Sequence, residues 1–301
     1  MTMQFEDDIF EEMRRCLLGA ASGDLIEFMY RKQGGEDTAH FSSETRAIAS
    51  NLGWIEKRSE QFTELGRCAA DSFREYMFWI QRRKALPFEG KADHLSASYF
   101  VKKSVVEIGC GMGANLMSIS SIANNLMGVE PTKAYAQVGS ILREREKMPP
   151  LDIRIGSAES LPFEDGQIDV ILCVAAHHYF DVCLAFREFA RVLKPGGEVL
   201  IIGDTWDTEA WLVLGDSLRK PVLVKRLLVD TINTMSYTAL RRRIIPARAN
   251  STTSRPIFPS RRSMNRWLHE AGLIANRPMI RVGPDTCYST QKLSRVGGEL
   301  I

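Results

Sequence analysis

The sequence predicts an α/β protein with a seven-stranded, mostly parallel sheet, helices on both of its faces, and a small helical domain before it. Three observations support this prediction. Between residues 101 and 203, short apolar runs typical of buried strands alternate with segments of helical periodicity, which favours right-handed crossovers and parallel strands. A turn with three glycines follows the first of these runs. The 301 residues are 45% hydrophobic and 25% charged, the composition of an ordinary globular protein.

The first strand and the glycine turn belong to a unit that suits a cofactor containing adenosine. The unit has a strand at 105–108, a turn with Gly109, Gly111 and Gly113, a helix at 114–124 and a strand at 126–130 that ends in Glu130. Such glycines allow a sharp bend, close approach of a ligand to the backbone, and tight packing of helix on strand. A carboxylate at the end of the second strand can accept hydrogen bonds from both ribose hydroxyls. The turn alone also fits the dinucleotide pattern G-x-G-x-x-G/A, so a nicotinamide cofactor is an alternative at this point.

The rest of the chain continues the alternation of strand and helix. The further expected strands are 151–155, 168–173 and 198–203, with helices at 132–148 and 182–193 and a final hairpin at 278–282 and 286–293. The charged run 143–147 is expected to be a solvated helix face. In open parallel sheets, ligands bind beyond the carboxyl ends of the strands, where the strand order reverses. Chemistry is therefore expected in the segment 174–180.

Residues 1–88 are expected to form a separate N-terminal module. They contain four segments of helical periodicity and two short strands at 54–57 and 61–63, and the stretch NLGWIEKRSEQFTELG resembles a winged helix. A winged helix that binds DNA needs a basic face. Residues 1–100 instead carry 13 basic and 17 acidic side chains, and the expected recognition segment offers only Arg46. This composition argues against DNA binding. The module also resembles the N-terminal modules of many small-molecule O-methyltransferases, and this resemblance implies dimerisation or closure of a substrate pocket instead.

Four sequence blocks decide between the two cofactors. They are VVEIGCGMG at 105–113, GVE at 128–130, GSAESLPFEDGQIDVILC at 156–173 and EFARVLKPGGEVLII at 188–202. In this order and spacing they resemble the class I S-adenosylmethionine-dependent methyltransferases, in particular the family that includes the ubiquinone/menaquinone methyltransferases. The last two blocks have no role in a nicotinamide oxidoreductase. The resemblance implies a Rossmann-like methyltransferase domain at 89–301 and S-adenosyl-L-methionine as the cofactor.

The resemblance also implies which residues bind the cofactor. Gly109, Gly111 and Gly113 line its methionine end, Glu107 steadies the turn, Glu130 binds the ribose, Ala158 and Glu159 border the adenine, and Cys173 ends the strand beside this site. The family usually has Gly-Asp-Ala where this chain has Ser157 between Gly156 and Ala158. A hydroxyl, Glu159 or a backbone group must therefore replace the acid that caps the adenine amino group.

The candidate catalytic residues are His178, His177 and Tyr179, in the segment after the strand 168–173. A methyl acceptor must be held in line with the S–CH3 bond, and a general base helps where the acceptor is a hydroxyl or a protonated amine. Histidine suits this role because its pKa lies near neutrality. His178 is preferred to His177, and Tyr179 comes third. In the family, a histidine here is also frequent as a structural or cofactor-contacting residue.

The net charge of +2 hides a basic C-terminal third. Residues 207–301 carry 16 basic and 7 acidic side chains, and the resemblance implies that an insertion at 207–260 forms a substrate lid. Such a lid would receive an anionic acceptor, for example a carboxylate, a phosphate or an acidic lipid surface. A solvated lid with incidental charge is the alternative.

The cysteines and the hydropathy of the chain indicate the cellular compartment. The six cysteines form no C-x-x-C pair and no zinc-finger spacing, so we expect reduced, mostly buried thiols and no metal site. We also find no signal-like N-terminal segment and no apolar run long enough to cross a membrane. We therefore expect a cytoplasmic protein without a transmembrane segment.

The expected function is methyl transfer to a small-molecule acceptor. The alternatives are a methyltransferase that acts on RNA or protein, and a DNA-binding regulator that senses S-adenosylmethionine. We do not expect a nucleic-acid partner, because no basic stripe is interleaved with aromatic residues. The acceptor, the methylated atom and the oligomeric state are left open, although a hydrophobic N-terminal module would suit a homodimer.

Overall fold

A computed structural model of the chain describes residues 3–205, 221–246, 255–283, 285–293, 295–296 and 299–300. The chain divides into two compact units. The first contains residues 1–101, 110–122 and 126–155, and the second contains residues 102–109, 123–125 and 156–301. The boundary between the units therefore falls within the glycine turn, directly after Gly109.

Four helices form the N-terminal part of the first unit: α1 (Asp7–Leu18), α2 (Ser22–Gly34), α3 (Ser43–Asn51) and α4 (Glu64–Gln81). Capping side chains start two of them, because Ser42 accepts a hydrogen bond from Thr45 N and Thr63 accepts one from Gly66 N. The two short strands expected after α3 are reduced to one bridge between Ile55 and Phe62. The winged-helix resemblance therefore stays a prediction.

The first unit also contains the glycine turn and the elements that follow it. These are the 3-10 turns η1 (Asp93–Leu95) and η2 (Ala97–Phe100), the helices α5 (Ala114–Ile119) and α6 (Lys133–Arg145), and the strands β2 (Asn125–Glu130) and β3 (Asp152–Ile155). β2 and β3 pair in parallel, with Glu130 opposite Ile155.

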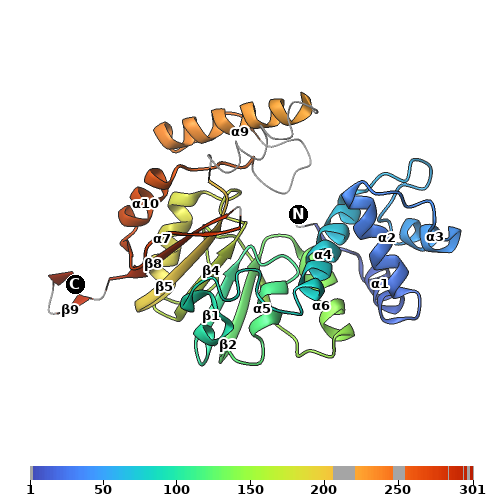
Figure 1. Cartoon of the computed structure of the whole chain (residues 1–301), viewed down its shortest axis with the longest axis horizontal. Coiled ribbons are helices and arrows are strands. Elements are labelled where there is room, and N and C mark those ends of the chain that lie inside the picture. The colour runs from blue at the N-terminus through green and yellow to red at the C-terminus, as the bar shows by residue number, and fades with distance from the viewer. Residues whose placement is uncertain are drawn as a thin grey trace. The chain divides into compact units, whose positions relative to one another are not determined.

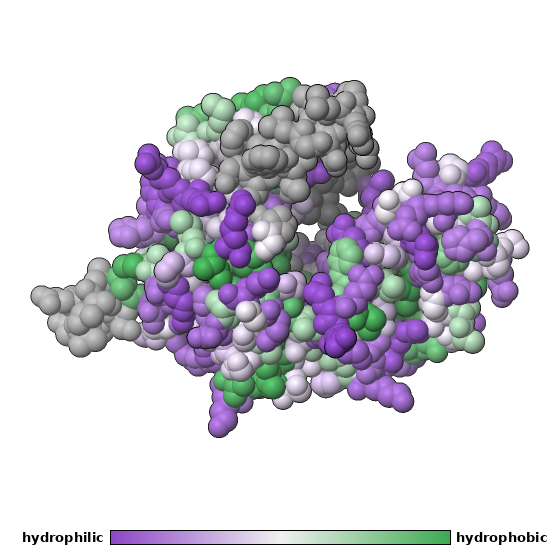
Figure 2. Space-filling model, viewed as in Figure 1, coloured by the Kyte–Doolittle hydropathy of each residue, from purple (hydrophilic) through white to green (hydrophobic). Residues whose placement is uncertain are grey.

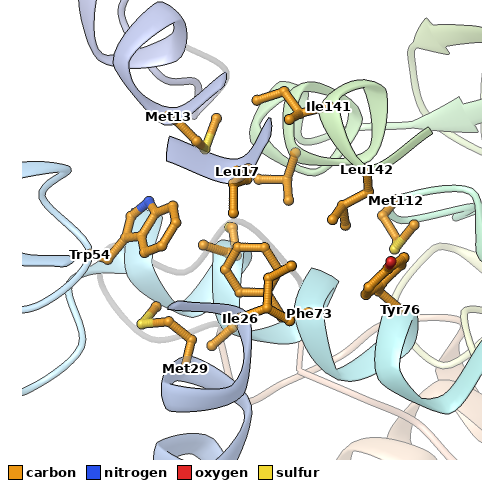
Figure 3. Packing of buried hydrophobic residues seen from close by; sticks show 14 of the residues in the cluster. Met13, Leu17, Ile26, Met29, Trp54, Phe73, Tyr76, Met112, Ile141 and Leu142 are labelled. Carbon is orange, nitrogen blue, oxygen red and sulfur yellow. The ribbon is translucent and has the colours of Figure 1, made fainter. Parts of the chain in front are cut away.

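The N-terminal helices share one buried core with α6 and the glycine turn. In Figure 3, Met13 and Leu17 of α1, Phe73 of α4 and Leu142 of α6 point toward one another. Met112, in the middle of the turn, belongs to the same cluster and is fully buried. Full burial of each such side chain contributes about 1.5–3 kcal/mol to folding. The helices before the turn therefore pack directly on the residues that hold it.

The charged run at 143–147 is only in part the solvated face that the sequence predicts, because Glu144 and Lys147 are exposed and the other three residues are not. Arg143 is only 4% exposed. Its neighbours pair with the N-terminal helices, since Arg14 donates to Glu144 at 2.8 Å and Lys84 donates to Glu146 at 2.6 Å. The prediction was wrong for Arg143 because the sequence does not show that residues from a distant part of the chain cover this side of α6.

The second unit contains most of the sheet. Its strands are β1 (Ser104–Ile108), β4 (Ile168–Val174), β5 (Leu193–Gly203), β6 (Leu273–Ala275), β7 (Ile280–Val282) and β8 (Asp285–Lys292). β4 runs parallel to β1 on one side and to β5 on the other. β8 is antiparallel to β5, and β6 and β7 are antiparallel to β8. β2 and β3 follow β1 in the sequence and pair with each other, but the next strand, β4, pairs with β1. The order of the strands therefore reverses between β1 and β4.

The predicted fold class is confirmed as an α/β, mostly parallel, Rossmann-like sheet flanked by helices. Each of the seven strands predicted for the sheet is present, and the short β6 is an addition to it. β1, β4 and β5 are apolar and buried along most of their length, as parallel strands covered by helices should be.

The described residues of the second unit form three helices: α7 (Val182–Val192), α9 (Pro221–Leu240) and α10 (Arg261–Glu270). Figure 1 shows α7 and α10 beside β5 and β8, with α9 as a long orange helix. α9 is tied to the start of α7, because the Tyr237 hydroxyl donates to Asp181 at 2.7 Å and accepts from Cys183 N at 3.1 Å. The chain ends in a short antiparallel pair, β9 (Arg295–Val296) and β10 (Glu299–Leu300). None of the helices within the described ranges has the length and apolarity to cross a bilayer.

Candidate active site

The glycine turn adopts a backbone conformation that side chains with a Cβ rarely tolerate. The φ angles of Gly109, Gly111 and Gly113 are 68°, 53° and 87°, all in the left-handed region that favours glycine. A Cβ added to Gly109 would lie 2.5 Å from the Cβ of Ala176. The three glycines are therefore required by the geometry of the turn.

Glu130 lies at the end of β2 and faces the turn, as the sequence predicts. One carboxylate oxygen accepts a hydrogen bond from Gly111 N at 3.1 Å, and the other accepts one from Thr132 N at 3.0 Å. The side chain is 6% exposed, and burial raises its pKa to about 7. Each carboxylate oxygen can accept a further hydrogen bond. Glu130 thus fixes the turn and keeps the capacity to accept the hydroxyls of a ribose.

Two further charged residues hold the turn, and sequence reasoning missed both. Glu75 of α4 approaches the turn, because a Cβ added to Gly111 would lie 3.1 Å from its carboxylate. Burial raises the pKa of Glu75 to about 7, and a hydrogen bond with the backbone of Met112 opposes this rise. Arg143 donates to the carbonyl oxygen of Met112 at 2.9 Å, and burial lowers its pKa to about 10. No motif marks either residue, so only the packing of α4 and α6 shows their role.

The raised carboxyl pKa values predict that stability falls as the pH rises. Because burial raises the pKa of Glu75 from 4.5 to about 7, the folded state binds more protons than the unfolded state between these values. Glu75→Gln removes this titration. We expect the unfolding free energy of the variant, relative to wild type, to increase by up to about 3 kcal/mol as the pH rises from about 5 to about 7.5. Denaturant unfolding without cofactor measures this difference, and a difference independent of pH would contradict it.

The two histidines after β4 are buried and close together. The ring centroids of His177 and His178 are 4.0 Å apart, and His178 also stacks on Phe258 at 4.8 Å. Burial lowers the pKa of His177 to about 4 and that of His178 well below its ordinary value. A Cβ added to Gly203 would lie 2.6 Å from the His177 ring, so His177 packs where only glycine fits. Both rings are therefore neutral at pH 7 and are weak bases in this state.

The backbone after the histidines is bound by the C-terminal part of the second unit. The carbonyl oxygen of His178 accepts hydrogen bonds from Ile257 N at 3.1 Å and from the Arg243 guanidinium at 3.0 Å. Arg243 also donates to the carbonyl oxygen of Phe180 at 2.9 Å. Tyr179 lies between these anchors and is 42% exposed. The lid expected at 207–260 thus contacts the segment 178–180 through its described residues, while 207–220 and 247–254 lie outside the described ranges.

α9 turns polar side chains inward, and one of them is a buried carboxylate. Asp230 is 2% exposed, burial raises its pKa, and its Oδ2 lies 3.5 Å from Arg226 Nε without accepting a hydrogen bond from the described residues. One turn further along, Thr234 accepts a hydrogen bond from Phe258 N. Asp230 therefore lies on the same face of α9 as the contact that reaches Phe258 and, through it, His178. In the sequence, Asp230 is the single acidic residue within an apolar run, and this pattern is the signal that could have identified it.

The remaining candidate residues are placed as follows. Glu107 is buried in β1, at 2% exposure, and Ala158 is buried after β3. Glu159 accepts a hydrogen bond from Asp181 N at 2.6 Å and so steadies the start of α7. Cys173 has no exposed surface and its pKa is raised to about 12 by burial, so it is a packed thiol and not a thiolate. All six cysteines are free thiols.

Comparison with known proteins identifies the central part of the chain. Residues 106–201 match the family model of a methyltransferase domain. Residues 106–201 are therefore similar to the methyltransferase domains of class I, which use S-adenosyl-L-methionine. The match decides between the two cofactors that the glycine turn alone allows, and S-adenosyl-L-methionine is the cofactor of this class.

Two curated relatives resemble the methyltransferase domain and not the rest of the chain. The uncharacterized methyltransferase YcgJ of Bacillus subtilis is 39% identical over 99 residues, which are 33% of this chain and 39% of that protein. Phthiotriol/phenolphthiotriol dimycocerosates methyltransferase 1 of Mycobacterium ulcerans is 35% identical over 101 residues, 33% of this chain and 36% of that protein. The chain therefore spans well under half the length of these relatives.

A solved structure shares the fold of a larger part. A complex between the Trm112 methyltransferase activator of Haloferax volcanii and a methyltransferase contains a chain that covers 78% of this one at a TM-score of 0.51, and 99% of that chain is covered. Its sequence identity is 14%, so this likeness concerns the fold alone.

The residues around the turn fit the cofactor of the methyltransferase domain. Gly111 and Gly113 have positive φ angles and no side chain, so a ligand can approach their backbone closely. Glu130 supplies acceptors for ribose hydroxyls, and Glu75 adds a second carboxylate at the same turn. Burial raises the pKa values of both carboxyl groups, so a nearby cation would stabilise their charged forms. S-adenosylmethionine carries such a positive charge on its sulfur.

Proposed function

We propose that the chain transfers the methyl group of S-adenosyl-L-methionine to a small-molecule acceptor in the cytoplasm. The observation that carries this proposal is the glycine turn of the methyltransferase domain, in which Gly111 and Met112 are held by the buried Glu130 and Arg143 and by the half-buried Glu75. These contacts preorganise the backbone before any ligand binds, so little free energy is lost in ordering it.

The residues of the turn bind and orient the cofactor. When bound, S-adenosylmethionine supplies an electrophilic methyl group on a cationic sulfur. Glu130 receives the ribose, as the resemblance implies, while Gly111 and Gly113 let the methionine end lie against the backbone. The negative charge of Glu75 near Gly111 favours the cationic cofactor over the neutral product, S-adenosylhomocysteine.

The segment 177–180 and the inward face of α9 supply the acceptor side. His178 stays the proposed base, but its strongly lowered pKa favours an acceptor atom that needs little activation, such as a thiol, an activated carbon or a neutral amine. Among the described basic residues of the lid, Arg243 binds backbone carbonyls and Arg241 pairs with Glu270. On the inward face of α9 the carboxylate of Asp230 is paired with Arg226, so this pair presents no net charge to an acceptor. This pairing supports a neutral acceptor better than the anionic one.

Substitution of Gly111 tests the cofactor part of the proposal. Gly111→Ala forces a Cβ to within 3.1 Å of the Glu75 carboxylate at a φ of 53°. A strain of about 1–2 kcal/mol at the turn should weaken binding of S-adenosylhomocysteine about tenfold or more. Gly166→Ala is the matched control, since Gly166 has a φ of 66° with nothing within 4 Å. Equal affinities for the two variants, measured by calorimetry, would refute the role of the turn.

Release of S-adenosylhomocysteine in the presence of different acceptors tests the reaction. The panel contains small molecules with thiol, amine, hydroxyl and activated-carbon groups, together with bulk RNA and denatured protein. We expect turnover with a member of the small-molecule set. Turnover with RNA or protein and with none of the small molecules would replace the proposal by the macromolecular alternative.

A further inference from the structure

The helix α9 presents its apolar side to solvent. Leu228, Ile232, Met235 and Ala239 follow the spacing i, i+4, i+7 and i+11, which places them on one face. Leu228 is 59% exposed and Met235 is 68% exposed. Figure 2 shows this hydrophobic surface, in green, along the upper edge of the view. A surface helix of a soluble domain ordinarily places such residues toward the core.

Hydrogen bonds fix this orientation of α9. The side chain of Asn233 donates to the carbonyl oxygen of Ile245 and accepts from Ile245 N, at 3.0 and 2.9 Å. Thr234 accepts from Phe258 N, and Tyr237 bonds to Asp181. Rotation of the helix to bury its leucines would break these bonds and leave buried polar groups without partners, which is costly. The apolar face is therefore held outward by the fold.

Positive charge brackets the apolar face. Lys225 is exposed at the N-terminal end of α9, and Arg242 is exposed just after its C-terminal end. The described stretch 221–246 contains one acidic residue, Asp230, and this residue is buried. The outer surface of this stretch thus combines large apolar side chains with the basic side chains of Lys225 and Arg242.

We propose that α9 docks on the surface of a lipid bilayer that contains anionic lipids. An apolar helix face buries itself at the boundary between headgroups and acyl chains, and flanking lysine and arginine side chains attract anionic headgroups. Leu228, Ile232 and Met235 supply the first contact, and Lys225 and Arg242 supply the second. The bonds of Asn233 and Thr234 keep the docking face outward.

A second copy of this chain fits the face less well. Two copies related by a two-fold axis would bring the same patch together. With the helices antiparallel, Lys225 of one copy would approach Arg242 of the other, and with the helices parallel each basic end would meet its equivalent. Either arrangement juxtaposes like charges, which are destabilising. An anionic surface neutralises both ends at once.

The docking bears on the acceptor. The inward face of α9 contacts Phe258, which stacks on His178, so a docked α9 lies between the bilayer and the proposed acceptor site of its own unit. An apolar acceptor dissolved in the membrane then has the shortest route to this site. This consequence rests on the proposed function, whereas the docking itself does not require catalysis.

Flotation of the full chain with vesicles tests the docking. The vesicles contain phosphatidylcholine with about one-third phosphatidylserine, or phosphatidylcholine alone. We expect the wild type to float with the anionic vesicles, to float less with the neutral ones, and to be released by salt, because screening weakens attraction at the surface. The double variant Leu228→Glu/Met235→Glu should lose at least about tenfold in vesicle affinity, since charged side chains cannot enter the apolar layer.

The control is Leu184→Glu, which changes a leucine of α7 that is 48% exposed and lies off α9. It should float like the wild type, and circular dichroism checks that all variants are folded. Failure of the wild type to float, or equal flotation of the double variant, overturns the proposal. Gel filtration that shows a wild-type dimer, converted to a monomer by the double variant, assigns the face to a second copy instead. A catalytic failure leaves the flotation result unchanged, so the two proposals fail separately.

Discussion

Glu130→Ala is expected to weaken binding of S-adenosylhomocysteine about 100-fold. The substitution removes the carboxylate that accepts hydrogen bonds from Gly111 N and Thr132 N, together with the acceptors proposed for the ribose. Hydrogen bonds to a charged group contribute about 1.5–3 kcal/mol each, and the loss of two therefore corresponds to about two powers of ten or more in affinity. Calorimetric titration of the purified variant measures the change.

Glu144→Ala is the control for this experiment. Glu144 pairs with Arg14 at the surface of the same unit and does not contact the turn. Because an exposed ion pair contributes little to stability, this variant should bind like the wild type. If Glu130→Ala and Glu144→Ala bind the ligand equally well, Glu130 does not hold the cofactor.

Gly139→Ala is expected to lower the free energy of unfolding by about 3 kcal/mol, although alanine is the better helix former by about 1 kcal/mol. A Cβ on residue 139 of α6 would lie 2.3 Å from the carbonyl oxygen of Met112 and 2.9 Å from its carbonyl carbon. These are backbone atoms, so the glycine turn would have to move. We therefore expect a loss of cofactor affinity together with the loss of stability, measured by denaturant unfolding and calorimetry.

Gly23→Ala isolates the effect of the close contact from that of helix propensity. Gly23 lies in α2 with nothing within 4 Å of the position that a Cβ would take. This substitution should stabilise the protein by about 0.5–1 kcal/mol. A Gly139→Ala variant that gained stability in the same way would show that α6 does not press on the turn.

The strands and the glycine turn were predictable because their signals are local. Buried parallel strands appear as short apolar runs, and three glycines in five residues mark a turn with positive φ. Glu130 could be assigned because its position follows from the end of β2, and the structure shows its carboxylate on Gly111 N. These features depend on residues close together in the sequence.

The contacts made over long distances could not be predicted in this way. Glu75 reaches the turn from α4, and Arg143 reaches it from α6, so their roles depend on how helices far apart in the chain pack together. The histidines were expected as bases from their position after β4, but their burial lowers the pKa values and is a property of the packed structure. The outward apolar face of α9 is hidden in the sequence for the same reason, since hydrogen bonds from Asn233 and Thr234 decide which side faces solvent.

Titration of the full chain with S-adenosylhomocysteine, with NAD as the comparison ligand, tests the central claim most directly. If the turn held by Glu130, Glu75 and Arg143 is a site for an S-adenosyl cofactor, calorimetry will show saturable binding of S-adenosylhomocysteine at one site per chain and no binding of NAD. Binding of NAD in its place, or no heat from S-adenosylhomocysteine with a folded protein, would contradict the account.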